Sequence, residues 1–410
     1  MPSTSRSATR RSLALKLTLN VEKRPLHRLA FRAVDPSGKV LKEKTFDVRT
    51  GFPKTAVYER WFGEAMRNWR FKSAAKGVAW NKDTKTASLA AMPDADFNAD
   101  IVFEVVPSTP VPSVSEKGLV SFAADAGATV RYTLDGSQPA AEGGKVYSTP
   151  FAVAERCFVK AVAVKDGVVS DVSTSLVAPP RKGARKYRTF SVLGDSLSSY
   201  TGCVTPSDNL CWYPANPCSN NSKFTSPTNC WWYKFAEKFD IDMLRDNAYS
   251  GAPVSFMGWG DELIGPYRTQ RRKALIGSYS QSFVKRAWNV ADPDLIIVAG
   301  LANDGYTGAA EGSPVYSGWA EPATDEDAFT CSAAVPALCQ VFDTLKTQHP
   351  NAKIVFVKCV GKAESSLKTV CDHYGVQLVD FNNRAIHWTD AMTTELATKL
   401  ADALGENQTP

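Results

Sequence analysis

Short buried apolar runs alternate with helical patterns in the second half of this sequence, and this alternation restricts the fold more than any other feature. The apolar runs cover residues 187–193, 295–299, 354–357 and 376–379. The helical patterns cover residues 231–239, 325–347, 363–374 and 393–404. Strands that alternate with helices form βαβ units, in which helices cover both faces of a parallel sheet. We therefore predict an α/β fold with a parallel sheet for residues 183–410.

Two smaller segments precede this unit. Residues 1–106 contain short alternating stretches and one amphipathic pattern that predicts a helix over Thr55–Trp69. They indicate a small mixed or β-rich domain of unknown role. Pro107, Pro110 and Pro112 predict a stiff linker, and residues 107–182 otherwise alternate with period two between turns, which is typical of a small β-sandwich. The 410 residues suit two or three domains at about 100–200 residues each.

The N-terminus and the charge balance exclude several classes of protein. Apolar residues from Leu13 to Val21 alternate with period two, and Lys16 interrupts them, so they predict a strand rather than a signal peptide. No apolar run reaches the roughly 18 residues that a membrane-spanning helix needs. The net charge of +6 is too small and too dispersed to predict nucleic-acid binding.

Polar motifs follow three of the predicted strands. Gly194-Asp195-Ser196 follows the strand predicted over 187–193, and Gly300 to Asp304, with Asn303 in it, follows the strand predicted over 295–299. Asn247 to Gly251 follows a further strand that we expect between these two along the chain. In a parallel sheet these positions meet at one edge, where ligands bind. A serine on a tight turn beside two hydrogen-bond donors predicts a nucleophile with an oxyanion hole.

A serine nucleophile needs a base, and the chain has only four histidines. His27 lies in the N-terminal segment, while His349 and His373 end predicted helices, where a cation is favourable. His387 follows the last strand and its loop and precedes the final helix. Since this position is at the same sheet edge as Ser196, we predict that His387 is the general base.

These ordered blocks make residues 186–406 resemble the SGNH, or GDSL-like, hydrolases, a family of esterases and lipases with a flavodoxin-like three-layer α/β/α fold. The resemblance implies that Ser196 is the nucleophile and His387 the base. It implies an oxyanion hole formed by the N–H groups of Ser196 and Gly251 and by the side chain of Asn303. It implies no metal and no cofactor.

The sequence departs from the family pattern at three positions. Arg384 occupies the place of the usual Asp, Trp388 the place of the usual Pro, and Leu301 the place of a usual Gly. The first departure matters most, because an orienting carboxylate holds the imidazole of the base in the correct tautomer. Three alternatives remain: a Ser–His dyad with a backbone carbonyl as the orienting group, a substitute acid at Asp380 or Asp390, or weak activity.

Nine cysteines invite a prediction of disulfides. Four of them fall in an irregular stretch after the nucleophile, where a long loop needs a staple: Cys203, Cys211, Cys218 and Cys230. The absence of Cys-x-x-Cys pairs makes zinc the weaker interpretation, so we predict two disulfides and an oxidising location. Further candidate pairs are Cys331 with Cys339 and Cys359 with Cys371, whereas Cys157 is predicted to be a free thiol.

Aromatic residues gather in the same stretch. The candidates for contact with a sugar ring or an acyl group are Trp212, Tyr213, Trp232 and Trp259. Trp231 and Trp232 begin a predicted helix, so core packing is the alternative interpretation for both. No sequence signal separates the two interpretations.

The strings Ala128 to Pro139 and Lys160 to Gly167 resemble the small β-sandwich at the C-terminal end of chitobiase-like enzymes. Such modules accompany carbohydrate-active domains, so the resemblance implies either sugar binding or a rigid spacer. Together the two resemblances favour a carbohydrate O-acetylesterase that acts on a polysaccharide or glycan, located outside the cell, in the periplasm or on a virion, within a larger assembly or alone. The alternatives are an inactive hydrolase-like domain in a binding or structural protein, and a lipase or thioesterase.

Overall fold

The computed structural model describes residues 24–58, 66, 68–81, 85–214, 224–255, 282–318, 333–359, 366–381 and 387–407. Several predictions therefore lie outside the described residues. These are the N-terminal strand at 13–21 and the predicted roles of Cys218, Trp259, Cys331 and Arg384.

The C-terminal half contains the predicted parallel sheet. Its strands are β15 (Thr189–Gly194), β16 (Asp242–Ala248), β17 (Leu295–Gly300), β18 (Lys353–Lys358) and β19 (Gln377–Asp380). They lie in the spatial order β16-β15-β17-β18-β19, and every neighbouring pair among them is parallel. Numbered along the chain this order is 2-1-3-4-5, the flavodoxin-like arrangement. The predicted fold class is confirmed.

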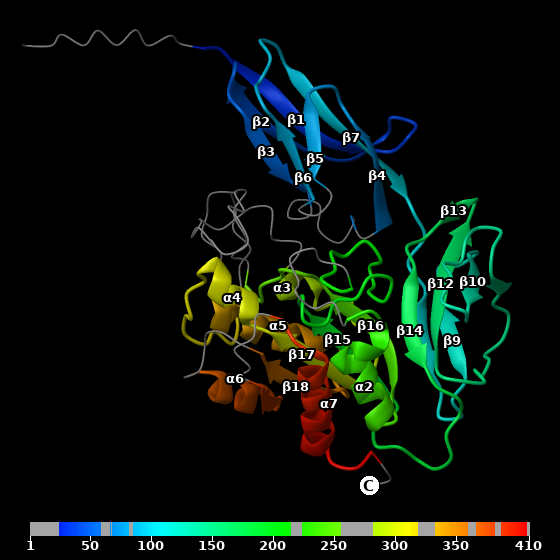
Figure 1. Ribbon diagram of the computed structural model, residues 1–410. Helices are drawn as coiled ribbons and strands as arrows, with labels where there is room; N and C mark the ends of the chain where they lie inside the picture. The colour runs from blue at the N-terminus through cyan, green and yellow to red at the C-terminus, as the bar shows by residue number, and fades with distance from the viewer. Residues whose placement is uncertain are drawn as a thin grey trace, which may run out of the picture.

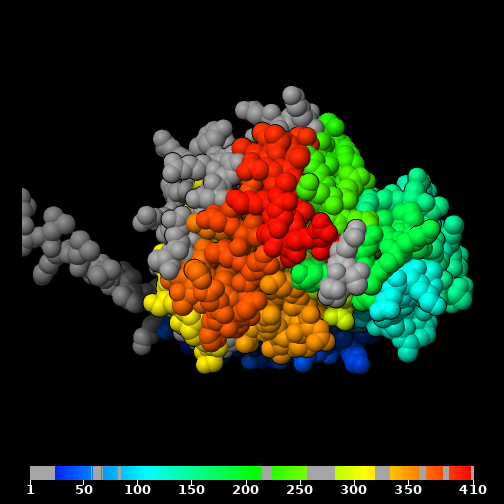
Figure 2. Space-filling view, turned by 90° about the horizontal axis from the view of Figure 1, so that it is seen from below, coloured from blue at the N-terminus to red at the C-terminus, as the bar shows by residue number. Residues whose placement is uncertain are grey.

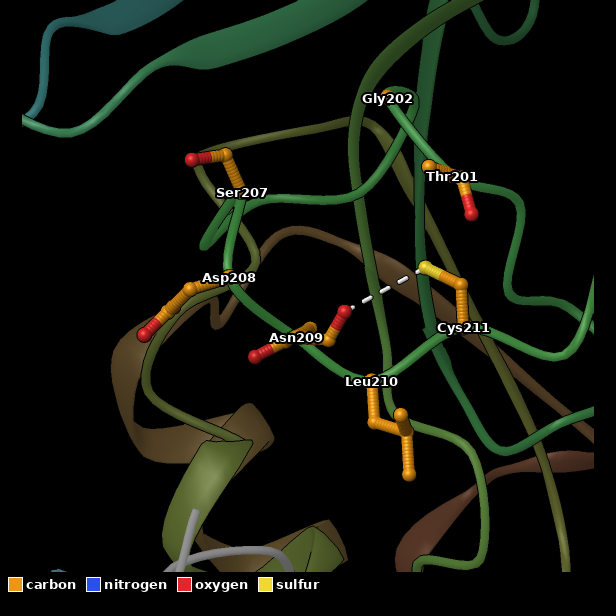
Figure 3. A pocket seen from close by; sticks show the side chains of 7 residues that line it. All are labelled: Thr201, Gly202, Ser207, Asp208, Asn209, Leu210 and Cys211. Carbon is orange, nitrogen blue, oxygen red and sulfur yellow. Dashed lines mark hydrogen bonds between the residues drawn. The ribbon is translucent and has the colours of Figure 1, made fainter. Parts of the chain in front are cut away.

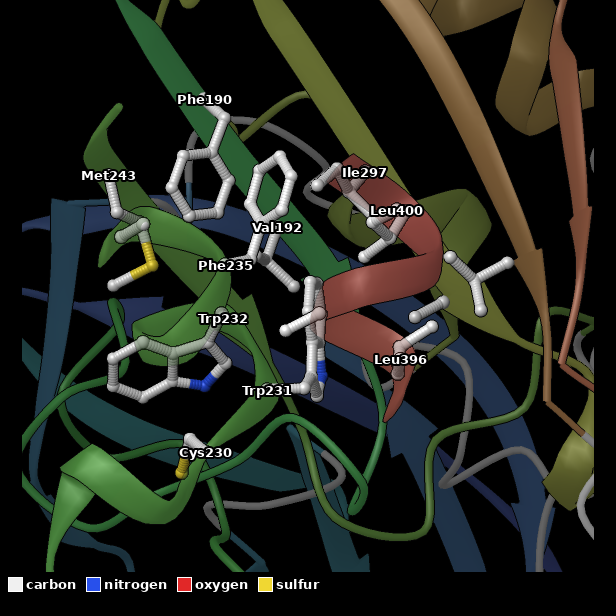
Figure 4. Close-up of a cluster of buried hydrophobic side chains, with 14 of the residues drawn as sticks. Phe190, Val192, Cys230, Trp231, Trp232, Phe235, Met243, Ile297, Leu396 and Leu400 are labelled. Carbon is white, nitrogen blue, oxygen red and sulfur yellow. The ribbon is translucent and has the colours of Figure 1, made fainter. Parts of the chain in front are cut away.

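Helices cover both faces of this sheet (Figure 1). On one face lie α2 (Trp231–Lys238) and α7 (Asp390–Leu404), and on the other lie α3 (Phe283–Arg286), α5 (Ala334–Gln348) and α6 (Leu367–Tyr374). Side chains on successive strand positions point to opposite faces, so each strand contributes to two cores. Val192 and Ile297 pack with α2 and α7, as Figure 4 shows, whereas Leu193 and Ile296 pack with α3 and α5. The two-sided burial explains the apolar runs of β15, β17 and β18, whereas β16 also buries charged and amide side chains.

The helix predicted over Thr55–Trp69 is wrong at both ends. Lys54–Val57 forms strand β3 and pairs antiparallel with β6 (Thr86–Leu89), and Trp69–Ala74 forms β4. Pairing of these segments with β6 and β7 overrides a helical periodicity that is only about four turns long. Residues 59–65 between the two strands lie outside the described part of the chain.

The N-terminal region is β-rich, as predicted. One sheet has the order β2-β1-β7-β4 and contains β1 (Leu26–Val34), β2 (Val40–Arg49) and β7 (Phe97–Val105). The second sheet has the order β3-β6-β5, with β5 at Val78–Asn81. Phe31, Tyr58 and Phe103 form the centre of the shared core.

The middle region is a β module. Its strands are β8 (Val111–Val114), β9 (Val120–Ala123), β10 (Thr129–Thr133), β11 (Lys145–Val146), β12 (Cys157–Lys165), β13 (Val168–Val169) and β14 (Ser173–Val177). The linker predicted from Pro107 to Pro112 ends earlier than expected, because Pro112 lies in β8 opposite Phe122. A two-stranded ribbon such as β8-β9 leaves an edge on which proline is tolerated.

The sheet of the module continues into the hydrolase sheet. Strand β14 pairs antiparallel with β16 at Leu176 and Met243, which gives one sheet with the path β11-β10-β12-β14-β16-β15-β17-β18-β19. Figure 2 shows the module in cyan and green directly against the rest of the molecule. Among the described helices, none is long and apolar enough to cross a membrane.

Candidate active site

The predicted site residues lie at the carboxyl ends of β15, β16 and β17. Strand β15 has β16 on one side and β17 on the other, and the chain winds in opposite directions from it. Such a switch point is where ligands bind in open α/β sheets. Ser196 follows β15, Gly251 follows β16, and Asn303 lies in the short helix α4 (Ala302–Thr307) after β17.

The turn after β15, residues 195–198, is tight and carries Ser196. We call it the nucleophile turn after the predicted role of Ser196. A Cβ atom at Gly194 would lie 2.6 Å from Ser198 Oγ, so only glycine fits there. The Asp195 side chain accepts a hydrogen bond from Leu197 N at 3.0 Å, and Asp195 O accepts one from Ser198 N at 3.1 Å. Ser196 itself is largely buried, with 8% of its surface exposed.

Helix α2 forms hydrogen bonds with this turn. The indole N–H of Trp231 donates to Ser198 Oγ at 3.1 Å, and that of Trp232 donates to Ser198 O at 2.8 Å. Both indoles are completely buried, and Figure 4 shows them among the side chains of one core cluster. A buried ring cannot touch a substrate, so the prediction that Trp232 contacts substrate is wrong. Trp232 supports the nucleophile turn instead.

His387 lies beside Ser196. Its Nε2 is 3.2 Å from Ser196 Oγ, the separation of a nucleophile and its general base. Thr389, two residues later, caps helix α7 by accepting a hydrogen bond from Met392 N. The cap holds the start of α7 next to the His387 backbone.

Burial governs the charge state of His387. It lowers the pKa of the imidazole to about 4, and it is the only cause of the shift. At neutral pH the ring is therefore neutral and able to accept a proton. An imidazole that is paired with a carboxylate would instead have its pKa raised.

Neither predicted substitute acid contacts His387. Asp390 binds Lys234 Nζ at 2.6 Å and Asn229 Nδ2 at 2.8 Å. Asp380 is an exposed residue at the end of β19, opposite Lys358. Among the described residues, no carboxylate forms a hydrogen bond or ion pair with His387. An orienting role for Asp380 or Asp390 finds no support in this geometry.

Asn303 joins the three motif-bearing segments. Its Nδ2 donates to Ala252 O at 3.0 Å and approaches Asp195 Oδ2 at 3.4 Å. Gly251, next to Ala252, has a φ of +82°, a conformation that glycine adopts readily. We call residues 247–251 the glycine segment. The Tyr249 N–H donates to Gly194 O at 3.1 Å, which links this segment to the nucleophile turn.

Leu301 departs from the family pattern in identity but not in conformation. It has a φ of +78°, the left-handed geometry that the usual glycine adopts at no cost. Its side chain is 1% exposed and packs in the core with Phe283. Burial of the leucine offsets the strain of its backbone. Asp304, three residues later, accepts hydrogen bonds from Val254 N and Ser255 N and fixes the neighbouring loop.

Arg286 supports the site, and the sequence contained no signal for it. The side chain on α3 is 6% exposed, and it donates to Gly194 O at 3.0 Å and to Asn247 O. It thereby ties the ends of β15 and β16 together. Burial lowers the pKa of Arg286 to about 10 and raises that of Asp195 to about 7, while each charge partly stabilises the other.

The chain after Ser196 leaves the turn and comes back to it. We call residues 199–214 the return loop. Trp212 N donates to Ser199 Oγ at 2.8 Å and Tyr213 N to Ser199 O at 3.2 Å. The ring of Trp212, another aromatic residue predicted to contact substrate, stacks on the ring of His387 and so lies in the site. Tyr213 is 1% exposed and stacks on Phe224, so the prediction that it contacts substrate is wrong.

A shallow hollow of about 270 Å³ lies in the return loop, and Figure 3 shows the side chains around it. It adjoins the glycine segment, because Ser250 N donates to Leu210 O at 2.7 Å and Asn209 Nδ2 to Ala248 O at 3.0 Å. Polar and apolar atoms contribute about equally to its lining. The lining residues are Thr201, Gly202, Ser207, Asp208, Asn209, Leu210 and Cys211.

The predicted disulfides are wrong for the described cysteines. All seven of these are free thiols: Cys157, Cys203, Cys211, Cys230, Cys339, Cys359 and Cys371. The return loop is ordered by hydrogen bonds to the nucleophile turn and to the module, where Asp171 accepts from Ser207 N at 2.9 Å. A covalent staple is therefore unnecessary. Burial raises the pKa of Cys211 to about 12, which makes this thiol unreactive. The described residues also contain no group of His, Cys, Asp or Glu side chains suited to a metal ion.

A sequence model of the GDSL-like lipase/acylhydrolase family matches residues 188–402. This stretch covers more than half of the chain and includes Ser196, Gly251, Asn303 and His387. The chain belongs to the GDSL-like lipase/acylhydrolase family. The C-terminal unit of this GDSL-like protein is accordingly a hydrolase domain of a family that acts on esters.

A second sequence model, of the family described as Fn3 associated, matches residues 120–177. The resemblance of this β module to the chitobiase-like sandwich thus stays a prediction. No curated protein matches the sequence.

Solved structures with likeness to the chain include GDSL-like lipases and a carbohydrate esterase. Proteins described as GDSL-like lipases come from Bacteroides uniformis and Bacteroides ovatus. The first is 28% identical, with 54% of this chain and 96% of that chain covered and a TM-score of 0.44. The second is 25% identical, with 52% and 95% covered and a TM-score of 0.43. A carbohydrate esterase family 2 enzyme of Corynascus thermopiles with a carbohydrate-binding domain is 16% identical, with 68% and 86% covered and a TM-score of 0.34.

Proposed function

We propose that this GDSL-like protein is a serine esterase that removes acetyl groups from a carbohydrate. One observation carries the proposal: His387 Nε2 lies 3.2 Å from Ser196 Oγ at the switch point of the sheet. The neutral state of His387 at pH 7 supports it, because the base must be free to accept the serine proton.

In the first half of the reaction, Ser196 Oγ attacks the ester carbonyl carbon while its proton passes to His387 Nε2. The carbonyl oxygen becomes an oxyanion, and the proposed donors to it are the N–H groups of Ser196 and Gly251 and the Asn303 amide. His387 then gives its proton to the sugar oxygen as the ester bond breaks. The products are a free sugar hydroxyl and an acetylated Ser196.

In the second half, water attacks the acetyl-serine. His387 takes one proton from the water and returns it to Ser196 Oγ when the acyl bond breaks. The second proton of the water stays on the product, so acetic acid leaves and ionises to acetate in the solvent, and the enzyme regains its starting state. Asn303 must give up its contact with Asp195 Oδ2 to bind the oxyanion, and the length of that contact, 3.4 Å, makes this exchange inexpensive.

The substrate class rests on the hollow in the return loop, which adjoins the segment after β16. The side chains of Thr201, Ser207 and Asn209 donate to protein groups there, and their oxygen atoms can still accept hydrogen bonds from sugar hydroxyls. A polysaccharide substrate would place the enzyme at or outside the cell envelope. The described cysteines give no support to an oxidising location, because they are free thiols.

The test is hydrolysis of p-nitrophenyl acetate by the full chain and by Ser196→Ala. We expect the variant to lose about 10⁴-fold or more in kcat, because the nucleophile and its base act as a unit. Ser37→Ala, an exposed turn serine, serves as the control and should match the wild type. Turnover that is the same in the wild type and in Ser196→Ala, or absent from both on any acyl ester, would reject the esterase.

Acyl-chain length then separates the classes of ester. We expect p-nitrophenyl acetate to be hydrolysed faster than the octanoate, and acetate to be released from an acetylated xylan. A preference for octanoate would instead identify a lipase or thioesterase. Efficient hydrolysis of the small ester without release of acetate from any polysaccharide would contradict the carbohydrate substrate.

A further inference from the structure

We propose that Trp212 is the positioning residue for His387 and takes the place of an orienting carboxylate, which none of the described residues supplies beside this base. The inference rests on the proposed function, since it concerns the same Ser196–His387 pair. It rests on the contact geometry of the indole and on the way in which the return loop is fastened.

The indole and the imidazole lie face to face. Their ring centroids are 3.5 Å apart and their planes differ by only 5°. A parallel stack at this distance leaves no room for a water layer, and it restricts the tilt of the imidazole. The rotation that would carry Nε2 away from Ser196 Oγ is opposed by the loss of this contact.

Trp212 is itself held from both sides of the site. On the nucleophile side its backbone N–H donates to Ser199 Oγ at 2.8 Å, and Ser199 Oγ donates in turn to Ser196 O at 3.2 Å. On the base side the neighbouring Tyr213 donates its hydroxyl to Trp388 O at 3.3 Å. The Trp212–Tyr213 pair thus connects the turn that holds Ser196 with the segment that holds His387.

Among the residues that the structure describes, no charged side chain forms a hydrogen bond or ion pair with His387. The described elements around the site carry Asp195 on the nucleophile turn, Asp390 on α7, Lys234 on α2 and Arg286 on α3. Asp390 and Lys234 are paired with each other, and Arg286 and Asp195 interact with each other. None of the four shifts the pKa of His387, for which burial is the only cause.

A stacked indole can also stabilise the charge that appears during the reaction. When His387 takes the serine proton it becomes an imidazolium, and a cation over the face of a tryptophan is attracted by the negative face of the ring. In an ordinary triad the carboxylate supplies this attraction. Trp212 therefore offers both functions of the missing acid, orientation and stabilisation of the cation, without a charge of its own.

The test compares Trp212→Ala with Trp212→Phe in the full chain, using kcat/KM for p-nitrophenyl acetate between pH 4 and pH 9. For Trp212→Ala we expect a loss of roughly 30-fold at pH 8. Removal of the indole also hydrates the imidazole, so the pKa of His387 rises and the acid limb of the profile moves up by roughly one to two pH units. The loss at pH 5 should therefore exceed the loss at pH 8.

Trp212→Phe keeps a flat ring and should recover most of both effects. Tyr316→Ala is the matched control, because Tyr316 stacks on His373 at 3.9 Å in a part of the molecule away from the site, and it should leave the profile unchanged. A uniform loss at every pH in Trp212→Ala, or no recovery in Trp212→Phe, would overturn the positioning role. These results are separable from a failure of the esterase itself, which Ser196→Ala reports.

Discussion

Asn303 carries two contacts that hold the site in its resting state. Its amide reaches Ala252 O and Asp195 Oδ2, so a single side chain joins the loop after β16 to the nucleophile turn. The same amide is the proposed oxyanion donor. Both the proposed catalysis and the contact between these two loops therefore depend on the Asn303 amide.

Replacement of Asn303 by alanine should lower kcat for p-nitrophenyl acetate by about 10²–10³-fold, the usual cost of one lost oxyanion donor. KM should change little, since the donor acts mainly in the transition state. Steady-state kinetics with Asn98→Ala, an exposed position on β7, as the control will measure this. Wild-type kcat in Asn303→Ala would show that Asn303 is not a donor in the oxyanion hole.

At the scale of elements, the site depends on how three strand ends are held in register. Helix α3 has only four residues, yet its Arg286 donates to carbonyl groups at the ends of β15 and β16. These carbonyls are buried, and an unsatisfied buried acceptor is costly. The short helix therefore acts as a clamp on the edge from which the motif residues project.

Substitution of Arg286 by methionine should lower the free energy of unfolding by about 3–5 kcal/mol, because it removes a donor to buried carbonyl groups and leaves the buried Asp195 carboxyl without its opposite charge. Urea unfolding followed by tryptophan fluorescence measures the change. Lys238→Met in the last turn of α2, an exposed position, should stay within about 0.5 kcal/mol of the wild type. Equal stability of both variants would show that Arg286 is not a clamp.

At the scale of the whole molecule, the β module is part of the hydrolase structure rather than a spacer attached to it. Strand β14 extends the sheet at β16, and Phe158 of β12 contacts Trp232 of α2. Arg181 forms two hydrogen bonds of 2.8 Å with Asp242, which is buried at the start of β16. The module also holds the return loop through Asp171 and Ser207.

We therefore expect the module and the hydrolase unit to unfold together. Leu176→Ala, at the fully buried seam between β14 and β16, should cost about 2–5 kcal/mol and expose amides of β12 and β16 at the same denaturant concentration in hydrogen exchange. Val146→Ala, on the exposed strand β11, is the control. Loss of protection in β16 alone would show that the two units are independent.

The periodicity of the sequence determined the α/β fold of the C-terminal half. Strands buried on both faces read as continuous apolar runs, and this pattern is local, so it can be recognised without the tertiary structure. The order of the motifs also brought Ser196 and His387 together, because the carboxyl ends of parallel strands share one edge. Those inferences needed only short-range pattern and topology.

Only the tertiary structure decided what surrounds that pair. Tyr213 and Trp388 are 175 residues apart, and no local pattern encodes their hydrogen bond or the Trp212–His387 stack beside it. The same holds for Arg286, which reads as an ordinary basic residue, and for the cysteines, whose clustering suggested disulfides where hydrogen bonds order the loop. Burial and pairing between distant segments depend on the packed fold, so a single sequence determines the elements and the order of their motifs but not the contacts between them.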